Sequence, residues 1–324
     1  MSIIALSCGD TNGIGPEISI KLIQLKANKN NKFILSIPEN IFENYINQIP
    51  NNIYYQIFNN NTIVKNYKAN VIINLLPSVK FEPGIPTEDS GRASFESLLK
   101  SLDFVDKNIA DGIVTAPISK YAIKKAGINF PGHTELIADR YGVKTPVMTF
   151  ISPKFLVALV TIHEPIKNVS KLLNEDLLYN VIQTLKQSLK FDFGIESATI
   201  AVLGLNPHAG ENGEIGDEEI NVISKIIDND NSLFGPFVPD AYFGDKKFKK
   251  FDLTLGMYHD QVLIPFKYIA FDKGVNYTAG LPIVRTSPDH GTAYDITGKM
   301  VANPKSILHA YNWAVKIINN RKKC

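Results

Sequence analysis

Apolar and polar positions along this chain form two alternating patterns. Short runs of aliphatic and β-branched residues that end on turn formers are typical of buried strands. Between them, apolar residues recur every three or four positions, as in amphipathic helices. This alternation predicts an α/β protein with largely parallel sheets. The runs that predict strands are IIALS, FILSI, VIINLL, GIVTAPI, VMTFIS, FLVALVTIH, ATIAVLGL and FDLTLGM, and the predicted helices begin at Pro16–Glu17 or cover 94–112, 132–142, 174–194, 218–228 and 304–320.

Three histidines each follow one of the predicted strands. His163 ends FLVALVTIH, His208 follows ATIAVLGLNP and His259 follows FDLTLGMY. Because parallel strands present their carboxyl ends at one edge of a sheet, where ligands bind, the three imidazoles can converge although they are distant in sequence. A histidine at a strand end is often purely structural, but the context shared by all three predicts a catalytic divalent-metal site with open positions for substrate.

Nitrogen ligands suit Zn²⁺, Co²⁺ or Ni²⁺, and Mg²⁺ or Mn²⁺ becomes an option if substrate oxygens complete the shell. Two acidic residues are candidates to support a ligating imidazole or to accept a proton. Asp260 follows His259 directly, and Asp240 lies in GPFVPDAYF. Both are equally well explained as solvated acids in turns.

Four further features are typical of ligand-binding segments, and each has a purely structural alternative. GDTNGIGPE (9–17) matches neither the dinucleotide fingerprint nor the Walker A loop, but its glycines precede a helix start, which suits a polar or anionic ligand as well as a tight turn. GHTE (132–135) suits a phosphate or carboxylate, or is a plain helix cap. Three basic residues suit binding of a substrate phosphate, or are solvated surface charges: Lys267, Lys273 and Arg285. SPDHGTAYDITGK (287–299) suits adenine and ribose, or is a long surface loop.

Length and composition narrow the protein class. A chain of 324 residues favours two domains, and a net charge of +2 gives no electrostatic reason to expect a nucleic-acid or membrane partner. The two cysteines, Cys8 and Cys324, indicate no disulfide framework, and neither a signal peptide nor a membrane-spanning run is recognisable, so we expect a cytoplasmic protein. Residues 26–70 are rich in Asn, Lys and Ile, but recurring aromatic residues favour a folded segment over disorder.

Several segments, in order, closely resemble the 4-hydroxythreonine-4-phosphate dehydrogenase family of the pyridoxal 5′-phosphate pathway. They are GIGPE, PGHTE, GLNPHAGE, MYHDQ-LIP-K and GLPI-RTSPDHGTA-DI-GK, and the resemblance spans about residues 2–320. GDTNGIGPE and HGTAYDITGK also look like loops of the isocitrate and isopropylmalate dehydrogenase superfamily. The resemblance implies two α/β domains around a cleft, with a first domain of residues 1–130 plus 268–324 and a second of residues 131–267. It also implies a homodimer whose active sites draw on both subunits.

The resemblance also assigns roles to individual residues. It places the metal ligands at the three histidines. The chain departs from the family's usual first loop at Thr11 and Asn12. Around the first metal histidine it reads TIHEPIKNV where the family more often has THIPL, and the ligand itself is retained. It implies substrate binding by His133, Thr134, Lys267, Asn276 and Arg285, and cofactor binding by Gly13, His290, Gly291, Thr292, Ala293 and Asp295.

The implied reaction is the metal-assisted oxidation of 4-(phosphooxy)-L-threonine by NAD⁺ or NADP⁺, with one Zn²⁺, Mg²⁺ or Co²⁺ ion. The 3-keto acid that forms would lose carbon dioxide to give 3-amino-2-oxopropyl phosphate. Asp260, Asp240 or a metal-bound water is the candidate base. A dehydrogenase of threonate or erythronate 4-phosphate is the nearest alternative. A true isocitrate or isopropylmalate dehydrogenase is disfavoured because those enzymes hold Mg²⁺ with aspartates, and a non-enzymatic metal- or nucleotide-binding protein is disfavoured by the intact segments.

Overall fold

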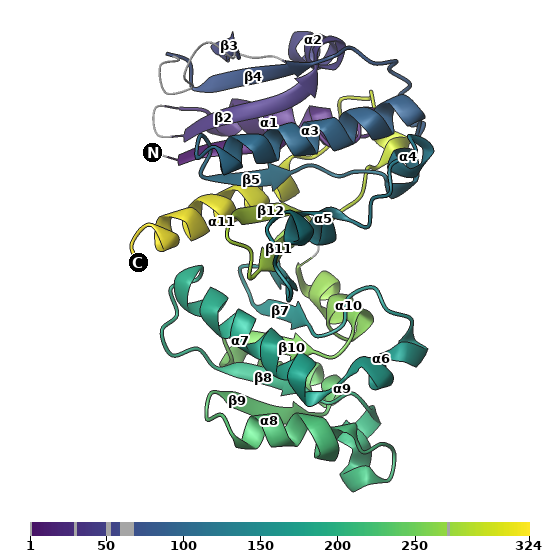
Figure 1. The fold of residues 1–324 in the computed structure, drawn as a ribbon, viewed down its shortest axis with the longest axis vertical. Helices are drawn as coiled ribbons and strands as arrows, with labels where there is room; N and C mark the ends of the chain where they lie inside the picture. Colours follow the sequence, from purple (N-terminus) through teal and green to yellow (C-terminus); the bar gives the residue numbers. More distant parts are fainter. Residues whose placement is uncertain (1, 29–30, 50–52, 59–67, 271–272) are drawn as a thin grey trace. The chain divides into compact units, whose positions relative to one another are not determined.

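The computed structural model describes residues 2–28, 31–49, 53–58, 68–270 and 273–324. It divides into two compact units (Figure 1): unit 1 comprises Met1–Leu136 and Pro282–Asn319, and unit 2 comprises Ile137–Leu281 and Asn320–Cys324. Within the described ranges, no helix is both long and apolar enough to span a bilayer.

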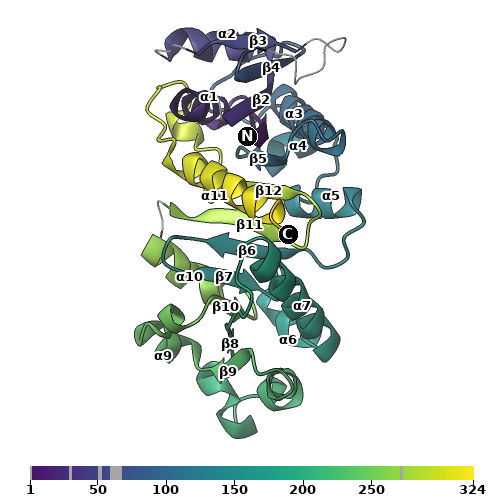
Figure 2. The same ribbon diagram turned by 90° about the vertical axis from the view of Figure 1, so that its left-hand side faces the viewer.

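Unit 1 is built around six strands that all pair in parallel. Helices α1 and α11 cover one face of these strands and α3 the other (Figure 2), which buries the inner strands on both sides, whereas the edge strand β3 is largely exposed. Across the sheet the strands are β3 (Tyr55–Ile57), β4 (Val71–Leu76), β2 (Asn31–Pro38), β1 (Ser2–Ser7), β5 (Gly112–Thr115) and β12 (Val284–Pro288). The helices of this part are α1 (Gly15–Lys26), α2 (Glu39–Gln48), α3 (Glu88–Asp106) and α4 (Lys120–Lys125), with a 3₁₀ turn, η6 (Tyr294–Ile296). Two further helices, α5 (His133–Arg140) and α11 (Lys305–Arg321), begin in unit 1 and end in unit 2.

Unit 2 combines parallel and antiparallel pairing. Strand β6 is antiparallel to both of its neighbours, whereas β7, β10, β8 and β9 run parallel. Across the sheet the strands are β11 (Val275–Ala279), β6 (Val147–Ile151), β7 (Leu156–Leu159), β10 (Leu253–Gly256), β8 (Ile200–Leu203) and β9 (Leu233–Phe237). The helical elements are α6 (Ile166–Leu172), α7 (Glu175–Phe191), η2 (Pro207–Gly213), η3 (Glu219–Ile223), α8 (Ser224–Asp228), α9 (Pro239–Gly244), η4 (Lys247–Lys250) and α10 (His259–Ala270).

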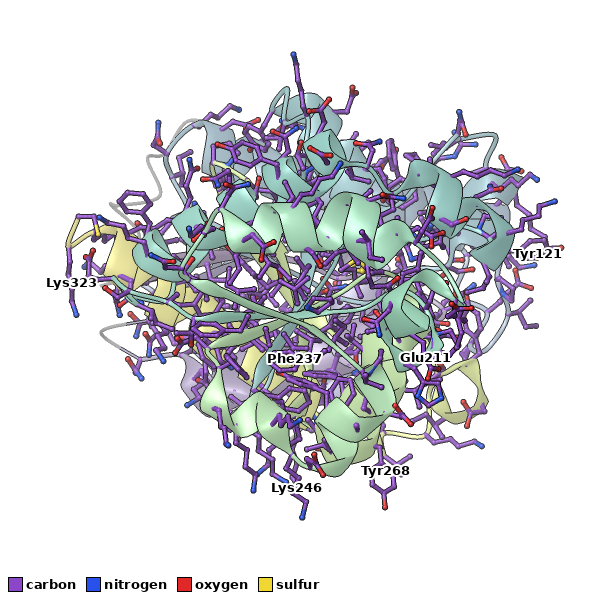
Figure 3. All side chains as sticks on the ribbon, turned by 90° about the horizontal axis from the view of Figure 1, so that it is seen from below. Tyr121, Glu211, Phe237, Lys246, Tyr268 and Lys323 are labelled. Atoms are coloured by element: carbon purple, nitrogen blue, oxygen red, sulfur yellow. The ribbon has the colours of Figure 1, made fainter. Side chains whose placement is uncertain are left out.

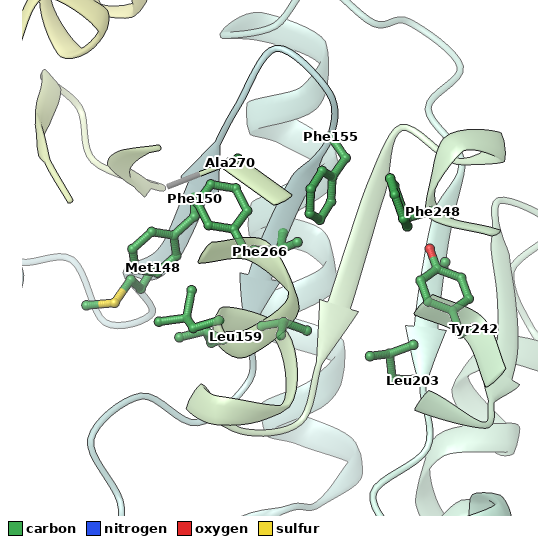
Figure 4. Close-up of a cluster of buried hydrophobic side chains, with 13 residues drawn as sticks. Met148, Phe150, Phe155, Leu159, Leu203, Tyr242, Phe248, Phe266 and Ala270 are labelled. Atoms are coloured by element: carbon green, nitrogen blue, oxygen red, sulfur yellow. The ribbon is translucent and has the colours of Figure 1, made fainter. Parts of the chain in front are cut away.

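Helix α10 is anchored to unit 2 along one side only. Tyr268 on its outer side is 92% exposed and extends away from the ribbon (Figure 3). On its inner side, the buried Phe266 packs against Phe150 and Phe155, with ring centroids 5.7 and 5.4 Å apart (Figure 4). Burying such an aromatic side chain contributes roughly 2–3 kcal/mol. This packing fixes the helix whose first residue is His259.

The expected α/β class is confirmed, and each of the eight predicted strands is present. The elements that were not predicted are strands β3, β9, β11 and β12 and helices α2, α4, α6, α9 and α10. Strands β11 and β12 mix polar and apolar residues, and α10 contains Pro265. The helix expected over 94–112 begins earlier, at Glu88, because Thr87 and Ser90 form a capping box.

The structure differs from the expected domain boundaries, and part of the 26–70 segment is folded as expected. Residues 268–281, which we expected in the first domain, lie in unit 2 because β11 pairs with β6, whereas 131–136 lie in unit 1. Part of the 26–70 segment is folded as β2, α2 and β3. Residues 29–30, 50–52 and 59–67 of that segment lie outside the described residues.

Helix α3 packs closely on α4 at Gly91, where a Cβ atom would collide with the carbonyl group of Ala122. We expect Gly91→Ala to lower the free energy of unfolding by about 2 kcal/mol, because overpacking costs about 3 kcal/mol and alanine regains only about 1 in helix propensity. Urea denaturation followed by circular dichroism measures this change. Glu96→Ala, at an exposed position of the same helix, is the control and should change stability by less than about 0.5 kcal/mol. Equal stability of the Gly91→Ala and Glu96→Ala variants would contradict the packing argument.

Candidate active site

The carboxyl ends of β7, β10 and β8 lie side by side in unit 2 and are tied together by hydrogen bonds. Thr161, after β7, donates its hydroxyl to the carbonyl of Met257, after β10, at 2.7 Å. Gln261 accepts the Met257 N–H at 2.7 Å and donates to the carbonyl of Gly204, after β8, at 2.6 Å. The three strands that precede the predicted metal ligands therefore end at one connected edge.

Two of the three histidines approach each other at this edge. The ring centroids of His163 and His259 are 6.0 Å apart, and both residues line a pocket of about 340 Å³ together with Ile166 and Tyr258. Nδ1 of His259 lies 2.6 Å from Oδ1 of Asp260. When Nδ1–H donates to this carboxylate, the lone pair of Nε2 is left available for a metal, an arrangement common among metal-binding histidines.

His208 lies in an unusual backbone segment. All residues from 208 to 213 have positive φ, and His208 itself has φ 54°. A left-handed conformation costs a residue with a Cβ about 1–2 kcal/mol, so the surrounding structure must maintain it. Within residues 2–28, 31–49, 53–58, 68–270 and 273–324, no group of three or more His, Cys, Asp or Glu side chains is arranged to hold a metal ion. The structure thus brings together His163 and His259, and the full trio stays a prediction.

The two candidate acids have different surroundings. Asp260 is exposed but contacts His259, as described above. Asp240 lies in the first turn of α9 and is also exposed. Of the two, only Asp260 contacts a predicted ligand among the hydrogen bonds of the described residues.

A buried cationic cluster lies in unit 1, where Thr134 and Arg285 are nearly inaccessible. The Arg285 guanidinium donates to Oγ1 of Thr115 at 3.0 Å, and burial lowers its pKa to about 10 although Glu135 lies nearby. Nε2 of His133 is buried and has no hydrogen-bond partner among the described residues. In the tautomer that carries its proton on Nε2, this unsatisfied nitrogen beside a buried guanidinium is well suited to an anion such as a phosphate group.

Charge and burial act together on His133. Burial lowers the pKa of its imidazole well below the usual value, and the positive charges of Arg285 and Lys120 lower it further. The ring is therefore neutral at pH 7, and one of its nitrogens can donate a hydrogen bond without the cost of burying a second positive charge beside Arg285.

The other two predicted substrate residues belong to unit 2. Lys267 lies in the last turn of α10 and is partly buried, and Asn276 lies on β11. Oδ1 of Asn276 is buried and, among the described residues, has no hydrogen-bond partner. An amide oxygen left unsatisfied in this way can accept a hydrogen bond from a ligand.

The predicted cofactor loop packs against the glycine-rich loop of unit 1. The Ile14 N–H donates to the Thr292 carbonyl at 2.9 Å, and a Cβ at Gly13 would lie 2.9 Å from the same oxygen. Ala293 is left-handed, with φ 46°. Outside this contact, the remaining predicted residues are exposed to solvent, as a ligand-binding loop requires; they are His290, Gly291 and Asp295.

Sequence reasoning missed several polar residues of this region. Tyr294 donates its hydroxyl to Asp10 at 2.7 Å, and burial raises the pKa of the Asp10 carboxyl. Asn12, one of the two departures from the family's usual loop, donates to the Ile85 carbonyl at 2.8 Å and accepts from the Glu82 N–H at 3.0 Å. Thr115 follows the pattern of the predicted histidines, a polar residue at a strand end, and that signal could have identified it.

Fold and site together define an α/β protein with a histidine-lined pocket in one unit and a buried cationic cluster in the other. The family model described as PdxA, pyridoxal phosphate biosynthetic protein PdxA, matches residues 28–314. The chain belongs to this family, which confirms the resemblance found from its motifs.

Similar proteins cover nearly the whole chain. The 4-hydroxythreonine-4-phosphate dehydrogenase of Sulfurihydrogenibium sp. is 36% identical over 98% of this chain and 99% of its own length. The protein of the same name from Hydrogenobaculum sp. is 41% identical over 94% and 96%. The crystal structure of 4-hydroxythreonine-4-phosphate dehydrogenase from Klebsiella pneumoniae matches with a TM-score of 0.84 and 30% identity, covering 98% of each chain.

The depressed pKa of His133 predicts a pH-dependent contribution to stability. Below the ordinary histidine pKa of about 6.5, the unfolded chain binds a proton that the folded protein excludes, so stability is lost as the pH falls. Between pH 6.5 and 5.5 we expect wild type to lose about 1 kcal/mol more than His133→Gln, a difference measurable by urea denaturation at each pH. His309→Gln, which changes a histidine of α11, is the control. If the stabilities of wild type and His133→Gln fell in parallel with pH, the pKa of His133 would not be depressed.

Proposed function

We propose that this chain is the dehydrogenase that oxidises 4-(phosphooxy)-L-threonine with NAD⁺ or NADP⁺ in pyridoxal 5′-phosphate biosynthesis. The relatives that carry the name 4-hydroxythreonine-4-phosphate dehydrogenase match this chain over nearly its full length. The observation that carries the proposal is the buried pair of Arg285 and His133, whose unsatisfied Nε2 suits the phosphate that distinguishes this substrate.

The phosphate is bound by side chains that are already in place. Arg285, which donates to Thr115, supplies a buried positive charge, and neutral His133 and Thr134 add donors at the start of α5. Lys267 and Asn276 complete the proposed substrate set. Because this binding energy acts far from the reacting carbon, it orients the hydroxyl group for oxidation.

The histidines would hold one divalent metal ion, Zn²⁺, Mg²⁺ or Co²⁺. His163 and His259 are 6.0 Å apart between ring centroids, and Asp260 orients His259, so their donor nitrogens fit such an ion. The ion, when bound, would lower the pKa of the substrate's secondary hydroxyl and polarise the carbonyl oxygen that replaces it. We assign His208 as the third ligand. As the resemblance to the family implies, we further propose a homodimer whose active sites draw on both subunits.

The remaining residues handle the proton and the cofactor. Asp260, or alternatively Asp240, accepts the hydroxyl proton. Gly13 and the loop residues His290, Gly291, Thr292, Ala293 and Asp295 hold the dinucleotide. NAD⁺ or NADP⁺ bound there would accept the hydride from the carbon that bears the hydroxyl. The resulting ketone stands β to the carboxylate, so that carbon–carbon bond breaks and carbon dioxide leaves, giving 3-amino-2-oxopropyl phosphate.

A related enzyme would use the same groups on threonate or erythronate 4-phosphate, which lack the amine. Steady-state turnover with each phosphorylated substrate decides between the two activities. Turnover of the hydroxy-acid phosphates alone would overturn the assignment to 4-(phosphooxy)-L-threonine.

His208→Ala should abolish turnover while leaving the fold intact, because the residue is exposed rather than part of the core. We expect kcat to fall by at least about 1,000-fold, because loss of a ligand weakens binding of the metal ion that would stabilise the developing negative charge. Circular dichroism checks the fold. His309→Ala changes the same residue type outside the proposed site, and wild-type kcat in both variants would contradict the metal assignment.

Arg285→Ala should raise the KM for the phosphorylated substrate strongly, with kcat/KM on the order of 100-fold lower, because a buried charged hydrogen-bond donor to the phosphate is lost. Thermal unfolding of the same preparation shows whether the variant is folded. Arg92→Ala, which removes an exposed arginine paired with Glu88, is the control. An unchanged KM in a folded Arg285→Ala variant would remove Arg285 from the phosphate site.

A further inference from the structure

The backbone that carries His208 is strained and is held from outside. Residues 208–213 all have positive φ, although only Gly210 and Gly213 among them lack a Cβ. Glu211 of this turn lies at the surface (Figure 3). Residues with a Cβ rarely adopt this conformation unless their neighbours enforce it, and such segments concentrate at functional sites.

The group that enforces it is the carboxylate of Glu219, which is only 2% exposed. One oxygen, Oε1, accepts the backbone N–H groups of Leu205 and Asn206, both at 2.7 Å. The other, Oε2, accepts the side-chain amide of Asn206 at 2.9 Å. A Cβ at Gly210 would lie 2.7 Å from Oε2, so the turn also closes directly over this carboxylate.

Asn206 links these contacts to the histidine. Its carbonyl accepts the N–H of Ala209 at 3.1 Å, which closes the chain around His208. Its side-chain amide is shared with Glu218, whose Oε2 lies 2.7 Å away. Glu219 therefore fixes Asn206 directly and, through the carbonyl of Asn206, also fixes Ala209. These two residues lie on either side of His208.

The chemistry requires a carboxylate at this position. An ionised carboxylate only accepts hydrogen bonds, and here it meets three donors. A glutamine of the same shape would turn an NH₂ group toward the amide of Asn206, and rotating that amide would instead direct its oxygen at Glu218. Glu219 also begins a π-helical turn, a rare element that occurs frequently at functional sites.

We propose that Glu219 is the positioning residue that holds His208 in the geometry needed to bind the metal ion. This inference rests on the proposed function, in which His208 is a ligand. It predicts that metal affinity depends on a buried carboxylate that does not itself bind the ion.

Titration of the full-length protein with Co²⁺, followed by its visible absorption, tests the inference without relying on activity. Glu219→Gln should weaken Co²⁺ binding by about tenfold or more, as for other groups that orient metal ligands. At saturating Co²⁺ the variant should regain most of its turnover with an unchanged substrate KM, a response that general destabilisation would not produce. Glu214→Gln removes an exposed carboxylate from the same segment and should bind Co²⁺ as wild type does.

His208→Ala in the same titration separates the two proposals. Unchanged Co²⁺ affinity in His208→Ala would refute the assignment of His208 as a ligand, and with it both proposals. Weakened binding in His208→Ala together with wild-type affinity in a folded Glu219→Gln would overturn the role of Glu219 alone. If Glu219→Gln does not fold, Asn206→Ala replaces it: this change removes only the amide between Glu218 and Glu219, and wild-type Co²⁺ affinity there overturns the inference.

Discussion

The connected edge formed by the ends of β7, β10 and β8 is the constraint on which the rest of the histidine site depends. Gln261 binds the backbone at the end of β10 and at the end of β8, and Thr161 joins the end of β7 to that of β10. These bonds fix the points from which the segments bearing His163, His208 and His259 leave the sheet. Because each segment begins at a fixed backbone position, short loops place His163 and His259 close together, and the proposed third ligand, His208, follows the neighbouring strand end.

The buried cluster of Arg285 and His133 in unit 1, which we propose as the phosphate site, keeps polar groups buried at a cost in stability. Arg285 is almost inaccessible, and its charge helps to keep His133 neutral. The unsatisfied Nε2 of His133 is costly to bury. In the proposed complex, a bound phosphate offsets that cost by accepting a hydrogen bond from His133 and adds a negative charge beside Arg285.

Much of this arrangement could be predicted from the sequence, because buried parallel strands leave a clear apolar signal. FLVALVTIH, ATIAVLGL and FDLTLGM identified three strand ends and hence the histidines that follow them. Helix α10 could not be predicted in the same way, since it contains Pro265 and opens on the polar pair His259 and Asp260.

Other features depend on contacts between residues far apart in the sequence. The left-handed turn at His208 is maintained by Glu219, and no local pattern of residues announces it. Thr115 reaches Arg285 only because β5 and β12 are neighbours in the sheet. Tyr294 and Asp10 meet through the packing of two loops. Such partners become visible only when the backbone is folded.

The central claim is that His163, His208 and His259 bind one common cation. Anomalous diffraction at the cobalt absorption edge, from crystals grown with Co²⁺, tests it most directly. The account predicts one strong anomalous peak per active site, within bonding distance of a nitrogen of each of the three rings. Three rings that point to different places, with no peak among them, would contradict it.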